Sequence, residues 1–167
     1  MPLSVWDLFL TFLVYFPAFA ANGSAVFVRK GTPVDFNRRA WDGRRVLGDG
    51  KTFEGLLVSI TLGTTVGVIL ASFLGPELIL YGFVGSLFGM LGDMCGAFIK
   101  RRLGLERGAR APVLDQLDFV VCATLGLYLV GYHVNLPGFL FVAVMAFVMH
   151  VLTNRVAYRL KLKSVPW

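Results

Sequence analysis

Long apolar runs alternate with short polar segments along the whole chain. Several of these runs reach the roughly 20 residues that a helix needs to cross the hydrocarbon core of a bilayer. They predict membrane spans at about residues 3–28, 56–74, 78–99, 113–134 and 137–157. The predicted fold class is therefore all-α, an integral membrane bundle of five transmembrane helices that forms a single membrane domain over residues 1–167.

The positive charges lie only between or after these apolar runs. All 16 Lys and Arg residues fall within the segments 29–51, 100–110 and 155–163. Five spans place these three segments on the same side of the membrane, and basic segments of this kind remain in the cytoplasm. We therefore expect a multi-pass protein of the cell membrane with its N-terminus outside, its C-terminus in the cytoplasm, and a polar site formed by two cytoplasmic loops.

The composition agrees with a membrane protein. With 56% hydrophobic residues, 16% charged residues and a mean hydropathy of +0.71, the chain is too apolar for a soluble domain of this length. A net charge of +6 would suit nucleic acid, but these charges flank the spans, and membrane topology accounts for them. We expect the lipid bilayer as a partner and no nucleic acid. Cys95 and Cys122 lie inside predicted spans without metal-ligand spacing, which indicates buried thiols.

The third predicted span carries an acid at membrane depth. Its small and polar residues recur on one third of the helix circumference; they are Gly82, Gly85, Ser86, Gly89, Gly92, Asp93, Gly96 and Lys100. The glycines alone indicate close helix packing. Asp93, however, lies about 10 Å from the membrane boundary, where an unpaired carboxylate is costly. Its partner is either Lys100, two turns away on the same face, or a divalent cation.

Two more acids, Asp115 and Asp118, stand at the start of the fourth span. If Pro112 opens that helix, the two acids share one face. A single acid there would be explained by the helix macrodipole, whereas two acids opposite Asp93 favour a Mg²⁺ site made of three carboxylates and phosphate oxygens.

The basic run that follows the third span, Lys100-Arg101-Arg102, suits the phosphates of a nucleotide. Together with the three acids it predicts phosphoryl or nucleotidyl transfer at a membrane surface. A small transporter or ion channel that uses Asp93 as its intramembrane ion site is the alternative, but it leaves the second acidic pair and the basic run unexplained.

These residues also resemble a family signature. The pattern consists of Gly92-Asp93, Ile99-Lys100-Arg101, Pro112 and Asp115-Gln116-Leu117-Asp118. It is similar to the signature of the CDP-diacylglycerol synthase (phosphatidate cytidylyltransferase) superfamily over about residues 85–120. Two departures are visible: the His-containing Gly-rich turn after the proline is missing, and Gln116 replaces the family's Arg. In length, span layout and the loop 33–52, the chain looks more like the short archaeal branch, the CDP-archaeol synthases.

The resemblance implies a CTP-dependent nucleotidyltransferase of archaeal phospholipid biosynthesis. An ether-lipid phosphate, 2,3-bis-O-geranylgeranyl-glycerol 1-phosphate, would attack the α-phosphate of CTP, giving CDP-archaeol and pyrophosphate with the help of Mg²⁺. The catalytic residues would be Asp93, Lys100, Arg101 and Asp118, and the metal ligands Asp93, Asp115 and Asp118.

The first cytoplasmic loop offers further candidates. The run Gly48-Asp49-Gly50-Lys51-Thr52 is not a Walker motif, because Arg45 stands where that motif needs glycine. Its turn still suits an anion, so we expect Gly50, Lys51, Thr52 and Arg102 to bind CTP, although topology alone also explains the basic residues. Asn22, at about the depth of Asp93, either contacts CTP or satisfies a backbone carbonyl freed near Pro17.

Overall fold

The computed structural model describes residues 4–28, 30–106 and 108–162. Its helices, in chain order, are α1 (Val5–Ser24), the short 3₁₀ helix η1 (Ala25–Phe27), α2 (Phe53–Leu74), α3 (Glu77–Arg102), α4 (Leu114–Leu129) and α5 (Leu136–Arg159). Within the described ranges, strand-like pairing is limited to two isolated bridges, Pro33–Thr52 and Arg39–Arg45. The all-α class is thus confirmed. Leu3, where the first predicted span begins, and the basic residues Arg29, Arg107 and Lys163 lie outside the described residues.

Four helices are long and apolar enough to cross a membrane: α1 with its extension to Phe27, α2, α3 and α5. The helix α4 has 16 residues, which is about 24 Å at 1.5 Å per residue, against a hydrocarbon core of about 30 Å. It ends well before residue 134, the predicted boundary, because a Schellman motif closes it. Gly131 has φ of 92°, and the Tyr132 N–H donates to the Leu127 carbonyl at 3.0 Å.

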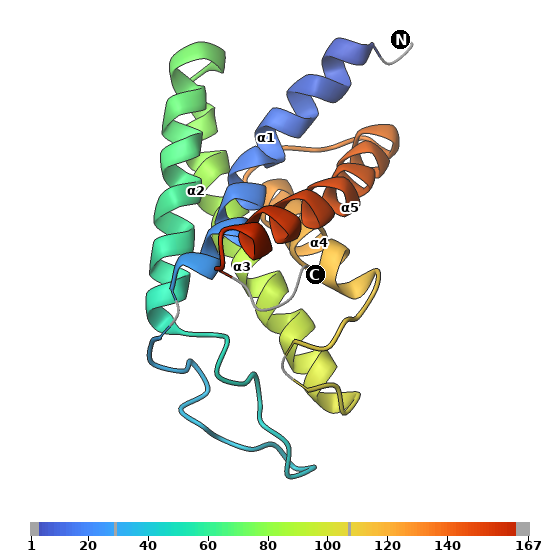
Figure 1. Cartoon of the computed structure of the whole chain (residues 1–167). Coiled ribbons are helices and arrows are strands. Elements are labelled where there is room, and N and C mark those ends of the chain that lie inside the picture. Colours follow the sequence, from blue (N-terminus) through green and yellow to red (C-terminus); the bar gives the residue numbers. More distant parts are fainter. Residues whose placement is uncertain (1–3, 29, 107, 163–167) are drawn as a thin grey trace.

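The helix α3 lies at the centre of the bundle and contacts α1, α2 and α4, while α5 packs on α1 and α4 (Figure 1). The helices α2 and α3 approach each other closely where both carry glycine. A Cβ atom built on Gly67 of α2 would lie 2.8 Å from the Cα atom of Gly82 in α3, so the two backbones touch. On the other side of α3, Tyr15, Phe119 and Leu127 are almost fully buried and form the apolar core.

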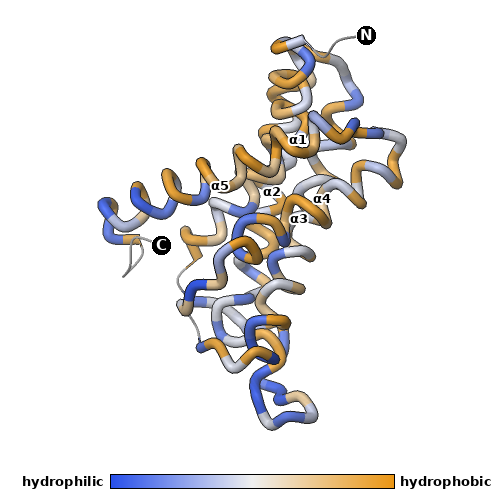
Figure 2. The backbone as a smooth tube through the Cα atoms, turned by 90° about the vertical axis from the view of Figure 1, so that its right-hand side faces the viewer, coloured by the Kyte–Doolittle hydropathy of each residue, from blue (hydrophilic) through white to orange (hydrophobic). Residues whose placement is uncertain are grey.

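The two long loops, described over residues 30–52 and over 103–106 and 108–113, lie at one end of the bundle, opposite the start of α1 (Figure 1). Figure 2 shows hydrophilic residues gathered at this end and at the C-terminal end of α5, whereas the helices are mostly hydrophobic. Many large apolar side chains on the helices are exposed, among them Leu57, Phe73 and Leu129 at 70%, 80% and 65%. Such a surface suits contact with lipid.

The end of α3 and the start of α4, on either side of the second loop, differ from the sequence-based prediction. The helix α3 continues to Arg102, so the basic run Lys100–Arg102 occupies its last turn, where cations interact favourably with the macrodipole. The helix α4 begins at Leu114 after Val113, whose φ is 71°; Pro112 therefore precedes the helix instead of opening it. The helix α1 continues through Pro17 to Ser24, so Pro17 does not break it.

Candidate active site at the loop end of the bundle

The first loop reaches the acid of α3 directly, because the Lys51 ammonium donates a hydrogen bond to the Asp93 carboxylate in an ion pair. The backbone of Lys51 is held on both sides. Its N–H donates to the Gly48 carbonyl at 3.2 Å, and its carbonyl accepts from the Val34 N–H at 2.8 Å. The partner of Asp93 therefore comes from the loop, and not from Lys100 as one sequence interpretation held.

Lys100 instead joins α3 to the start of α4. Its ammonium lies 2.7 Å from Oδ1 of Asp115. The other oxygen of that carboxylate, Oδ2, accepts from the Ala111 N–H at 2.9 Å. Both oxygens of Asp115 are thus engaged within the protein, one by a charge and one by the backbone that leads into α4.

Asp118 lies in the contact between α4 and α3. A Cβ atom on Gly96 would overlap its carboxylate, and one on Gly92 would overlap its main-chain carbonyl. Gly92 and Gly96 stand on either side of Asp93 in the sequence of α3, so Asp118 lies against the part of α3 that carries Asp93. We call Lys51, Asp93, Lys100, Asp115 and Asp118 the polar cluster; these residues come from the first loop, α3 and α4.

The donor chemistry of the polar cluster fits Mg²⁺. Among the described residues, no three His, Cys, Asp or Glu side chains form a ready-made metal cage, and Asp93 and Asp115 are paired with Lys51 and Lys100. Mg²⁺ does not need such a cage, since it is usually bound by one or two carboxylates together with water and substrate phosphates. Asp93 and Asp118 supply two neighbouring carboxylates, whereas Asp115 has no free oxygen for a third.

Asn22 lies near the C-terminal end of α1, which contacts α3. A Cβ atom on Gly89 of α3 would lie 3.5 Å from Cβ of Ala18 in α1, and the two helices run in the same direction (Figure 1). Asn22 and Asp93 each follow these contact residues by four positions, which is about one turn on the same helix face. This spacing agrees with the common depth expected from the sequence, which stays a prediction, as does contact between Asn22 and CTP.

The loop turn and the end of α3 face each other. A Cβ atom on Gly48 would lie 3.8 Å from Nη1 of Arg101, and Nε of Arg101 is buried without a hydrogen-bond partner in the described part of the chain. Gly50 lies within the turn that the Lys51–Gly48 hydrogen bond closes. Thr52 is the N-cap of α2, where its hydroxyl accepts from the Gly55 N–H, so this oxygen already has a structural role.

Arg102, which the sequence predicted to bind CTP, is engaged by the first loop. Its Nη2 donates to the Arg45 carbonyl at 2.6 Å, and its Nη1 lies 3.1 Å from Oδ1 of Asp42. The guanidinium also lies over the rings of Trp41 and Phe98, 5.4 and 5.0 Å from their centroids. These contacts give Arg102 an anchoring role, and its contact with CTP stays a prediction.

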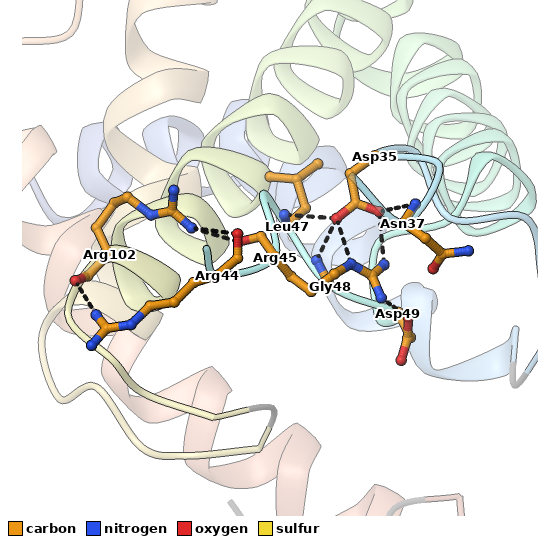
Figure 3. A network of polar contacts seen from close by, with 8 residues as sticks. All are labelled: Asp35, Asn37, Arg44, Arg45, Leu47, Gly48, Asp49 and Arg102. Carbon is orange, nitrogen blue, oxygen red and sulfur yellow. Dashed lines mark hydrogen bonds and ion pairs between the residues drawn. The ribbon is translucent and has the colours of Figure 1, made fainter. Parts of the chain in front are cut away.

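Asp35 is a buried loop residue that sequence reasoning did not single out; it is 7% exposed. Burial alone would raise the pKa of this carboxyl, but the Arg45 guanidinium and the N–H groups of Gly48, Leu47 and Asn37 donate to it and hold its pKa well below the usual range (Figure 3). The sequence signal for this role is the residue type alone, because an Asp side chain often accepts a hydrogen bond from the backbone N–H two residues later, here that of Asn37.

Comparison with known proteins gives one consistent result. The family model described as CarS-like, CDP-archaeol synthase, matches residues 5–167. The CDP-archaeol synthase of Sulfolobus acidocaldarius is 62% identical over 160 residues, covering 96% of this chain and 98% of that protein. The one from Sulfurisphaera tokodaii is 62% identical over the full length of both chains. A solved structure, described as an intramembrane enzyme for archaeal membrane lipids biosynthesis, has a TM-score of 0.84 at 37% identity, covering 90% of this chain and 94% of its own.

Proposed function

The chain belongs to the CDP-archaeol synthase family, and on that premise we propose how its polar cluster acts on CTP and a lipid phosphate. The activity of the family is CTP-dependent cytidylyl transfer, a nucleotidyltransferase reaction of membrane lipid biosynthesis. Family membership also decides against the ion-transport alternative, since the acids and the basic run are accounted for by this reaction.

In the proposed reaction, a phosphate oxygen of the archaeal ether lipid, 2,3-bis-O-geranylgeranyl-glycerol 1-phosphate, attacks the α-phosphorus of CTP. The new oxygen–phosphorus bond forms as the bond between the α-phosphorus and the bridging oxygen to the β-phosphate breaks. The products are CDP-archaeol and pyrophosphate. No general base is required, because the lipid phosphate is already ionised near neutral pH.

The residues of the cluster divide the work by charge. Asp93 and Asp118 would hold Mg²⁺, which when bound offsets the charge that develops on the leaving pyrophosphate. Lys51, Lys100 and Arg101 stabilise the phosphates by charge-assisted hydrogen bonds. Catalysis thus consists of positioning and charge neutralisation, without a covalent intermediate on the protein.

One contact between Lys51 and Asp93 carries this proposal. It brings a loop cation to a helix carboxylate beside Asp118, so that groups suited to phosphates and groups suited to Mg²⁺ share one place. Asp115 stabilises Lys100 and the start of α4. We therefore propose it as a residue that orients Lys100, or as an outer metal ligand that acts through water.

The location of the cluster supports a cytoplasmic site. It lies at the end of the bundle where both long loops gather (Figure 1), and these loops carry most of the basic residues, which favours the cytoplasmic side. CTP would then reach the site from the cytosol, while the lipid chains of the acceptor remain between or beside the helices in the bilayer.

Pyrophosphate release by the purified, detergent-solubilised chain tests the reaction. The assay contains CTP, Mg²⁺ and the ether-lipid phosphate, with ATP, GTP and UTP in parallel reactions. We expect release only when CTP and the lipid phosphate are both present. Equal release with all four nucleotides, or release without the lipid, from folded protein would contradict the assignment.

A further inference from the structure

The buried carboxylate of Asp35 is the centre of the first loop. Its Oδ1 accepts from Nη2 of Arg45 at 2.8 Å and from the Asn37 N–H at 3.1 Å. Its Oδ2 accepts from the N–H groups of Leu47 and Gly48 at 2.9 and 3.0 Å. Figure 3 shows these donors converging on the one carboxylate from both halves of the loop. A single side chain thus holds together residues that are up to 13 positions apart.

Gly48 links this network to the polar cluster. Its N–H donates to Asp35, and its carbonyl accepts from the Lys51 N–H. The residue before Asp35, Val34, donates to the Lys51 carbonyl. Both backbone hydrogen bonds of Lys51 therefore go to residues that Asp35 holds or adjoins, and the side chain of Lys51 then extends to Asp93.

The loop is also tied to α3 by an exchange of arginines. Nη1 of Arg44 donates to the Arg102 carbonyl at 2.7 Å, while Nη2 of Arg102 donates to the Arg45 carbonyl at 2.6 Å (Figure 3). The first contact satisfies a carbonyl at the C-terminus of α3 that has no partner within the helix. Because Arg45 also contacts Asp35, the network around Asp35 is fixed relative to the helix that carries Asp93.

We propose that Asp35 is a positioning residue for the nucleotide, which sets the backbone of Lys51 so that its ammonium meets the phosphates of CTP beside Asp93. This inference rests on the proposed function. Asp35 acts through Gly48 and Lys51 and touches no substrate. A displacement of about 1 Å at a positioning group can cost about 100-fold in rate, so loosening this network should weaken the handling of CTP and leave that of the lipid phosphate unchanged.

The test compares Asp35→Asn with the wild type and with Asp49→Asn. Asp49 is a matched control because it pairs with the same Arg45 at 2.7 Å, but its side chain is 59% exposed, against 1% for Asp35. Three quantities are measured: CTP binding by equilibrium dialysis, the KM values for CTP and lipid phosphate, and the rate at which Lys51 is acetylated in the absence of nucleotide. The acetylation rate reports the accessibility of Lys51 independently of cytidylyl transfer.

For Asp35→Asn we expect CTP affinity to fall about tenfold or more, an unchanged KM for the lipid phosphate, and faster acetylation of Lys51. Asp49→Asn should match the wild type in the KM for lipid phosphate and in the acetylation of Lys51, the two quantities that do not depend directly on the charge of the CTP-binding turn. Unchanged CTP affinity and Lys51 reactivity in Asp35→Asn would overturn the inference, as would equal losses for both substrates. If Asp35→Asn does not fold, Arg45→Lys takes its place, because it keeps the charge but loses the paired hydrogen bonds from Nε and Nη2 of Arg45 to the two oxygens of Asp35.

The wild type separates this inference from the function on which it rests. A wild-type chain that neither binds CTP nor transfers it, while Asp35→Asn still exposes Lys51 to acetylation, contradicts the function and leaves the link between Asp35 and Lys51 intact. A wild-type chain that is active, with an Asp35→Asn variant that behaves identically, contradicts the inference alone.

Discussion

Asp93 and Asp118 place two carboxylates on neighbouring helices, since Asp118 lies against Gly92 and Gly96 of α3, and lysines pair with the neighbouring acids Asp93 and Asp115. A charged side chain near the centre of a bilayer costs about 2.5–3.5 kcal/mol on insertion scales. Lys51 pairs with Asp93 and Lys100 pairs with Asp115. In the proposed complex the lysines turn to the phosphates and the carboxylates of Asp93 and Asp118 turn to Mg²⁺, so Asp93 has a partner of opposite charge in both arrangements.

Replacing Asp93 by Asn tests the metal-binding role at the scale of one residue. The amide keeps the size of the side chain but loses the charge, so we expect kcat to fall by about 100-fold or more and the Mg²⁺ concentration for half-maximal activity to rise. Steady-state pyrophosphate release over a Mg²⁺ titration measures both. Glu77→Gln, at the opposite end of the same helix, is the control; near-normal turnover in folded Asp93→Asn would refute the role.

Lys51→Gln tests the contact of the loop with phosphate. Removing one preorganised donor from a phosphoryl site costs on the order of 100- to 1000-fold in rate, and we expect a loss of that size in kcat/KM for CTP. The midpoint of thermal unfolding should also fall, because Asp93 loses its ion-pair partner, so the kinetics are measured on protein shown to be folded. Lys30→Gln, an exposed lysine of the same segment, should retain wild-type kinetics. Equal losses in the two variants would indicate a general effect of charge.

At the scale of elements, the contact between α3 and α4 depends on glycine where Asp118 approaches. A Cβ atom at Gly96 has no space beside the Asp118 carboxylate. The glycines that the sequence offered as a packing surface therefore also make room for a charged group. Packing and chemistry, which were alternative interpretations of the glycine pattern, use the same helix face.

Gly96→Ala should therefore disturb the site more than the fold. Overpacking of this kind costs about 1–3 kcal/mol in stability, while displacement of Asp118 should lower kcat by about tenfold to 100-fold. Unfolding in detergent and initial-rate kinetics measure the two effects. Gly23→Ala in α1 is the matched control, since its Cβ atom would meet nothing within 4 Å. Full activity in Gly96→Ala would mean that Asp118 can move without cost.

The sequence predicted the positions of the helices better than the contacts between residues that are distant in the chain. The long apolar runs located α2, α3 and α5 to within a few residues, because hydrophobicity over a span is a local property. The end of α4 was missed because Gly131 and Tyr132 close it by a local turn inside an apolar stretch. The partner of Asp93 was missed because it lies 42 residues away in a loop, and only the folded chain brings the two together.

Asp35 shows the same limit within a loop. Its neighbours in the sequence indicate a turn, but its importance comes from Arg45, Leu47 and Gly48, which reach it from the other half of the loop. Arg102 shows the converse. Its place in a basic run indicated phosphate binding, whereas the structure surrounds it with Trp41, Asp42 and loop carbonyls. Composition and spacing identify candidate charges, and tertiary contacts decide their roles.

At the scale of the whole molecule, the polar cluster at one end of an apolar bundle suits a reaction between a water-soluble and a lipid substrate. The exposed apolar surface of the helices keeps the protein in the bilayer, and the loops provide the polar environment that a nucleotide requires. The helix α4 begins at the loop end of the bundle, where it carries Asp115 and Asp118. It is shorter than α1, α2, α3 and α5.

The side of the membrane on which the loop between α4 and α5 lies decides the span count. If α4 crosses, with local thinning of the bilayer to match its length, His133 lies outside and Arg39, in the first loop, lies in the cytoplasm. We expect a membrane-impermeant maleimide to label His133→Cys in intact cells, and Arg39→Cys only after permeabilisation, in a chain whose Cys95 and Cys122 are replaced by Ala. Both variants must retain cytidylyl transfer. Labelling of both sites only after permeabilisation would show that α4 does not cross, leaving four spans with both termini on one side.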